Sequence, residues 1–71
     1  PTGIDAKTLH NILGVLKNNQ DGLSAEEIGE KMGASRTTAR RYLEYLISID
    51  ECRSEVEYGT VGRPERKYLL G

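Results

Sequence analysis

The sequence predicts an α+β fold in which three helices are followed by a β-hairpin. Three observations support this prediction. Apolar residues recur at helical spacing in three successive segments up to residue 49, and each segment begins with a residue suited to cap a helix. From residue 51 onward apolar and polar residues alternate, as they do in a strand. Two glycines and a proline between residues 59 and 64 then mark a turn before a second strand.

The first helix is predicted over residues 5–19, with Asp5 as its N-cap. Its apolar side is formed by Leu9, Ile12, Leu13 and Leu16. A cluster of turn-forming residues at 18–22 should end the helix. His10, the only histidine, lies near the apolar side and is expected to be partly buried.

The second helix is predicted over residues 24–32. Ser24 is followed three positions later by Glu27, the pattern of a capping box, in which each side chain binds the backbone N–H of the other residue. Gly33 should end this helix, because glycine adopts the left-handed conformation at low cost. Only Ala34 then separates Gly33 from Ser35. Two helices joined by so short a glycine-containing turn indicate a helix-turn-helix arrangement.

The third helix is predicted over residues 35–49, with Ser35 as its cap. Ala39, Leu43 and Leu46 fall on one side of it, whereas Thr37 and Arg41 fall opposite and Arg40 and Tyr45 flank them. This helix takes the place of a recognition helix, the helix that enters the DNA major groove in helix-turn-helix proteins.

The hairpin is predicted over residues 51–70, with its turn at 59–64 and a second strand at 67–70. Cys52 is expected to be a buried thiol on the first strand, and the four tyrosines are expected to pack in the core and on the hairpin. A helix-turn-helix followed by such a hairpin makes the expected fold a winged helix-turn-helix.

The charge is distributed unevenly along the chain, although its total is only −1. Residues 35–43 carry a net charge of +3 and residues 59–71 carry +2, whereas the segments 1–34 and 44–58 carry −2 and −4. Local charge decides what a surface attracts, because the Debye length is only about 8 Å at physiological salt. The two positive segments therefore predict a surface that binds the phosphates of double-stranded DNA.

Ten residues are candidate DNA contacts. They are Ser35, Arg36, Thr37, Thr38, Arg40, Arg41 and Tyr45 on the third helix, and Arg63, Arg66 and Lys67 on the hairpin. On the helix, Arg36, Thr37, Arg40 and Arg41 are suited to the major groove, and Ser35, Thr38 and Tyr45 to phosphates. On the hairpin, Arg63 is suited to the minor groove, and Arg66 and Lys67 to the backbone.

The alternative for the third helix is an ordinary solvated face. Arginines at a helix N-terminus oppose the helix dipole, at a cost of about 0.3–1 kcal/mol each at low salt, so a purely structural helix would tend to avoid them.

For the hairpin tip, a Gly-x-x-G loop of the RNA-binding KH fold, a minor-groove hook and a plain turn are alternatives to a wing. A wing is favoured, because strand-like sequence lies on both sides of the tip.

Other classes of function have less support. A winged helix that binds another protein and a small RNA-binding domain remain alternatives to DNA binding. With one histidine and one cysteine, the chain offers no nucleophile–base pair, disulfide or structural zinc site, so no enzyme activity, cofactor or metal is expected. No apolar run approaches the roughly 18 residues of a membrane span, and the expected compartment is the cytoplasm.

The chain also resembles a known family. The stretch from Leu23 to Leu43 is similar to winged helix-turn-helix transcription factors in general. The Tyr-Gly-x-x-Gly-Arg-Pro pattern at 58–64, followed by Tyr68 and Leu70, is more particular. It resembles the C-terminal DNA-binding domain of bacterial two-component response regulators that answer to citrate, malate and other di- or tricarboxylates.

The resemblance implies features outside the chain itself. Residues 1–4 would be the remnant of a linker that follows a receiver domain, absent here and phosphorylated by a sensor histidine kinase. The full protein would control carboxylate metabolism or transport, and it would bind DNA as a homodimer on two half-sites.

Overall fold

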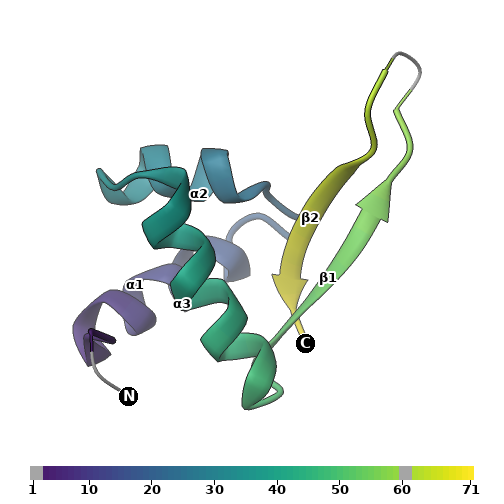
Figure 1. Ribbon diagram of the computed structural model, residues 1–71. Coiled ribbons are helices and arrows are strands. Elements are labelled where there is room, and N and C mark those ends of the chain that lie inside the picture. Colours follow the sequence, from purple (N-terminus) through teal and green to yellow (C-terminus); the bar gives the residue numbers. More distant parts are fainter. Residues whose placement is uncertain (1–2, 60–61) are drawn as a thin grey trace.

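The computed structural model confirms the predicted fold class (Figure 1). It describes residues 3–59 and 62–71; part of the predicted linker (1–2) and the centre of the predicted wing tip (60–61) lie outside the described residues. The elements are α1 (Ala6–Lys17), α2 (Ala25–Met32), α3 (Arg36–Ser48), β1 (Cys52–Glu57) and β2 (Glu65–Leu70).

Each helix begins with the cap that its sequence predicts. The Asp5 carboxylate accepts a hydrogen bond from the Thr8 N–H at 3.0 Å. Ser24 and Glu27 form the complete capping box, and Ser35 Oγ accepts from the Thr38 N–H at 3.1 Å. These caps satisfy backbone donors that the first turn of a helix leaves free, and so they fix where α1, α2 and α3 start.

Gly29, in the middle of α2, allows the tight turn between α2 and α3. It is buried, and a Cβ placed on it would lie 2.8 Å from the Ala34 carbonyl oxygen. The Ala34 N–H donates to the Gly29 carbonyl at 2.8 Å, and Gly33 takes the left-handed conformation with φ 74°. The backbone of Ala34 and Ser35 can therefore pack directly against Gly29 of α2 before α3 begins.

The end of α3 directs the chain into the hairpin. Asp50 has a positive φ of 61°, and the Glu51 N–H donates to the Leu46 carbonyl at 2.9 Å. A left-handed residue followed by this hydrogen bond is the usual way to end a helix, although glycine is more common at the position of Asp50. Strand β1 starts at Cys52, immediately after this turn.

The core is formed mainly by the three helices. Its largest fully buried side chains are Ile12, Leu16, Ile28, Leu43 and Leu46. Tyr68 and Cys52, at the base of the hairpin, close the core from the strand side. The burial of Cys52, with 4% of its surface exposed, confirms the prediction for this thiol, and burial raises its pKa.

The hairpin is antiparallel, and only its base is attached to the helices. Cys52 pairs with Leu70 and Glu57 with Glu65. At the base, Leu23 forms a backbone bridge with Tyr68 through hydrogen bonds of 3.1 and 2.8 Å. Figure 1 shows the rest of the hairpin projecting away from the helices.

Two expectations about single residues are wrong. Tyr58 is 80% exposed, because it follows the end of β1, on the part of the hairpin that no longer packs against the core. His10 is exposed as well, because the buried side of α1 passes through Ile12 and Leu16 instead. None of the described helices is long and apolar enough to span a membrane.

Candidate nucleic-acid interface

An open groove of about 660 Å³ lies between the start of α3 and the hairpin. It is lined by Ser24, Ala25, Glu26, Arg36, Arg40, Val56, Tyr58, Arg63, Pro64, Glu65, Arg66 and Tyr68. The two positively charged segments of the sequence therefore meet at one surface, which we call the arginine groove.

Four arginines dominate the charge of the arginine groove. Arg36 and Arg40 come from the first turns of α3, and Arg63 and Arg66 come from the hairpin. All four are exposed, and the lining includes only two carboxylates, those of Glu26 and Glu65. Guanidinium groups gathered in this way can bind phosphate oxygens or base edges through charged hydrogen bonds.

These arginines are largely free of ion pairs with the protein itself. Arg40 lies 3.4 Å from the Glu44 carboxylate, and both side chains are 54% exposed. Such an exposed pair contributes only about 0.3–0.5 kcal/mol, so a phosphate can replace Glu44 as the partner. Within residues 3–59 and 62–71, no carboxylate forms an ion pair with Arg36, Arg63 or Arg66.

Arg41 and Thr37, also candidates on α3, lie outside the arginine groove. Arg41 Nη2 donates to the Gly3 carbonyl oxygen at 3.4 Å, on the side of the helix that faces the start of the chain. Thr37 is exposed. Successive residues of a helix point about 100° apart, which explains how Arg40 and Arg41 come to lie on different sides.

Two of the three hydroxyl candidates for phosphate contacts, Ser35 and Thr38, form hydrogen bonds with each other at the start of α3. Ser35 Oγ caps α3 and donates to Thr38 Oγ1 at 3.1 Å. Thr38 and Tyr45 are half-buried, and Thr38 lines a second hollow, between α1 and the turn after α2, rather than the arginine groove. Ser35 is exposed and directly precedes Arg36, one of the groove arginines of α3.

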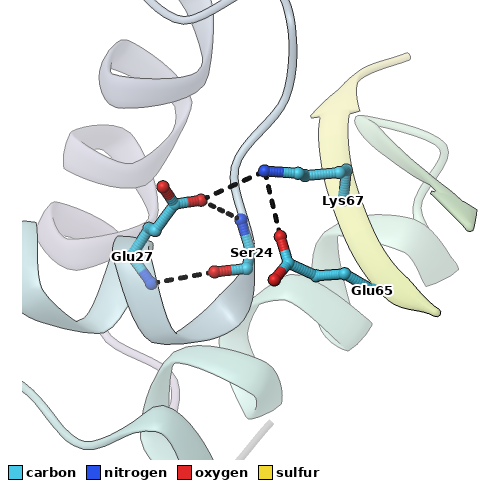
Figure 2. Close-up of polar contacts among 4 residues, drawn as sticks. All are labelled: Ser24, Glu27, Glu65 and Lys67. Atoms are coloured by element: carbon cyan, nitrogen blue, oxygen red, sulfur yellow. Dashed lines mark hydrogen bonds and ion pairs between the residues drawn. The ribbon is translucent and has the colours of Figure 1, made fainter. Parts of the chain in front are cut away.

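Lys67 faces the start of α2 and not the arginine groove. Figure 2 shows its ammonium group between two carboxylates, with Nζ 3.1 Å from Glu65 Oε1 and 3.5 Å from Glu27 Oε1. Only 20% of the Lys67 side chain is exposed. The hydrogen bond to Glu65, supported by the charge of Glu27, raises the pKa of Lys67.

Five residues of the hairpin that line the arginine groove were not among the predicted contacts: Val56, Tyr58, Pro64, Glu65 and Tyr68. The sequence nevertheless contained a pattern that could have indicated Val56 and Tyr58. Side chains alternate along a strand, so Val56 and Tyr58 lie on the same side as Cys52. Because Cys52 closes the core, the same side further along the strand must face the space beyond the core, next to α3.

The described residues contain no group of histidine, cysteine and carboxylate side chains that could hold a metal ion. The side chains gathered between α3 and the hairpin are instead suited to an anionic, elongated ligand. Three helices, a short glycine-containing turn between α2 and α3, and a hairpin beside α3 define a winged helix-turn-helix domain.

The chain belongs to the family of the DpiA-like helix-turn-helix domain, whose sequence profile matches residues 7–71. Members of this family include transcriptional regulators, as the names of the relatives below state, and the match confirms the resemblance identified from the sequence.

Three relatives illustrate the similarity. The chain is 64% identical over 70 residues to the transcriptional regulatory protein CitT of Bacillus subtilis. It is 46% identical over 70 residues to the probable C4-dicarboxylate response regulator DctR of Priestia megaterium, and 44% identical over 71 residues to the transcriptional regulatory protein DpiA of Escherichia coli K12. The alignments cover 99% or more of this chain but 31% of each relative, so the chain spans about a third of their length.

Proposed function

We propose that this chain binds double-stranded DNA sequence-specifically, as the output domain of a transcriptional regulator. The observation that carries the proposal is the arginine groove, in which Arg36 and Arg40 of α3 and Arg63 and Arg66 of the hairpin line one surface. Positive charge concentrated on a recognition helix and a wing attracts the negatively charged phosphates of a DNA backbone.

In this mode of binding, the first turns of α3 enter the major groove. Arg36, Thr37 and Arg40 read base edges or brace against the walls of the groove, and an arginine fork suits guanine. Arg63 reaches the minor groove from the wing, and Arg66 binds the backbone. Arg41, outside the arginine groove, contacts the backbone on the other flank of α3, with Ser35, Thr38 and Tyr45 as weaker phosphate contacts.

The names of the relatives support a proposal about the whole protein. It is a response regulator that controls carboxylate metabolism or transport, with a receiver domain phosphorylated by a sensor histidine kinase. It binds two half-sites as a homodimer and acts in the cytoplasm, where the bacterial chromosome lies. Recovery of the complete gene, together with a neighbouring histidine-kinase gene, would support this proposal.

The experiment that tests DNA binding is a titration of duplexes selected from random sequence, repeated over a range of salt concentrations. If about five cationic side chains neutralise phosphates, the slope of log affinity against log salt should be near −4.5. Replacing Arg40 with Ala should cost about 1–3 kcal/mol on the preferred site and relax the preference at one base pair.

Arg53 offers a matched control, because it is an exposed arginine of the hairpin that pairs with Glu55 and does not line the arginine groove. Arg53→Ala should leave affinity within about 0.5 kcal/mol of the unaltered chain. Equal losses for Arg40→Ala and Arg53→Ala, a flat salt dependence, or a preference for single-stranded RNA in competition would each overturn the proposal.

A further inference from the structure

The side chain of Lys67 connects the hairpin to the helices. Its Nζ lies 3.1 Å from Glu65, two residues earlier on β2, and 3.5 Å from Glu27 on α2. Within residues 3–59 and 62–71, the pair of Lys67 and Glu27 is the only ion pair between the hairpin and the helices. The backbone of the hairpin is joined to the segment before α2 by the bridge between Leu23 and Tyr68.

Glu27 is a rigid anchor for this lysine. Its Oε1 also accepts the Ser24 N–H at 2.9 Å, while the Glu27 N–H donates to Ser24 Oγ at 3.1 Å, as Figure 2 shows. Both the carboxylate and the backbone N–H of Glu27 are therefore held in the first turn of α2. An ion pair made to a side chain fixed in this way constrains its partner more than one made to a mobile side chain.

The part of the hairpin beyond this connection has little else to hold it. Every residue of β1 after Cys52 is exposed, and Glu65 and Arg66 of β2 are exposed too. The angle between hairpin and helices is therefore set close to Tyr68 and Lys67. That angle decides whether Arg63 and Arg66 lie beside Arg36 and Arg40.

We propose that Lys67 is a positioning residue: through Glu27 it fixes the wing at the angle that brings the wing arginines to the arginine groove. This role replaces the direct phosphate contact expected from the sequence. Two carboxylates already neutralise the Lys67 ammonium group, and its side chain does not line the groove. The inference rests on the proposed DNA-binding function.

The decisive variant is Glu27→Gln. Glutamine keeps an acceptor at the third position of α2, so the capping box survives, but the charge that holds Lys67 is lost. If Lys67 contacted phosphate, releasing it from Glu27 would strengthen DNA binding. The positioning role predicts the opposite, a weakening of about three- to tenfold, and the same for Lys67→Met.

Glu30→Gln is the matched control. It removes an exposed carboxylate from the same helix, at a residue that neither lines the arginine groove nor pairs with Lys67. Its DNA binding should stay within about twofold of that of the unaltered chain, because only a distant surface charge is removed.

A double-mutant cycle separates positioning from a general effect on stability. Arg63→Ala should cost several-fold less affinity in the Lys67→Met background than alone, because a displaced wing no longer presents Arg63. All variants are compared at a temperature at which circular dichroism shows them folded. Tighter binding by Glu27→Gln, or additive effects of Arg63→Ala and Lys67→Met, would overturn the inference alone. Absence of duplex binding by the unaltered chain would instead overturn the proposed function.

Discussion

At the scale of single residues, Glu27 serves two elements at once. Its carboxylate completes the cap of α2 and pairs with Lys67 of β2 (Figure 2). The hydrogen bond from the Ser24 N–H is the main cause that lowers the pKa of Glu27 below its usual value of 4.5, and the charge of Lys67 adds to it. A charged Glu27 is therefore favoured by the folded state.

This lowered pKa predicts how stability depends on pH. The folded state favours the charged form of Glu27. The contribution of Glu27 to stability is therefore present above pH 4.5 and is lost as the pH falls through its lowered pKa. Glu27→Gln should therefore lose less stability than the unaltered chain between pH 5 and pH 3, as measured by urea unfolding at a series of pH values.

Asp5 provides a comparison, since hydrogen bonds from Thr8 lower its pKa too. The loss of stability that Asp5 causes at low pH should therefore remain in the Glu27→Gln variant. An acid profile of Glu27→Gln as steep as that of the unaltered chain would show that Glu27 is not held in its charged form.

At the scale of the elements, the turn between α2 and α3 depends on a close approach of two backbones. Gly29 has no room for a side chain, because a Cβ would lie 2.8 Å from the Ala34 carbonyl oxygen and 3.2 Å from that of Ser35. Both neighbours are backbone atoms, which cannot move without shifting the start of α3. The same turn fixes the position of the first turns of α3, which carry Arg36 and Arg40.

Two glycine substitutions should therefore have opposite effects. Gly29→Ala should destabilise the fold by about 1–3 kcal/mol, because the added methyl group overlaps the turn. Gly14→Ala, in α1, should stabilise it by about 0.5–1 kcal/mol, because nothing lies within 4 Å of that Cβ and alanine favours a helix. Urea unfolding measures both, and stabilisation by Gly29→Ala would contradict the close approach.

At the scale of the whole molecule, the projecting hairpin makes the protein elongated. Its extents are 37 × 23 × 20 Å, with a radius of gyration of 11.7 Å. The longest extent is close to one turn of duplex DNA, which is about 34 Å. The arginine groove lies where the starts of α2 and α3 meet the hairpin.

If the proposed function holds, one copy of this chain should protect about one helical turn, roughly 10 base pairs, of a half-site duplex. Hydroxyl-radical footprinting on that duplex measures the protected length. Protection of two full turns by a single bound copy would contradict the proposed mode of binding.

The helix starts and the overall element order could be predicted because their signals are local. The capping box joins Ser24 to Glu27, and the left-handed Gly33 is followed at once by the cap Ser35. Each of these devices depends on residues within one helical turn, so the sequence displays it directly. The unequal distribution of charge along the chain is equally visible in the sequence.

The tertiary structure decided which charged groups share a surface. Arg40 lines the arginine groove and its neighbour Arg41 does not, while Lys67 meets Glu27 across 40 positions of sequence. No local pattern records such contacts, because they depend on where the bridge between Leu23 and Tyr68 holds the hairpin against α2. By itself, the sequence determined the helices, the hairpin and the charge of each segment; only packing decided which cations face a ligand and which brace the fold.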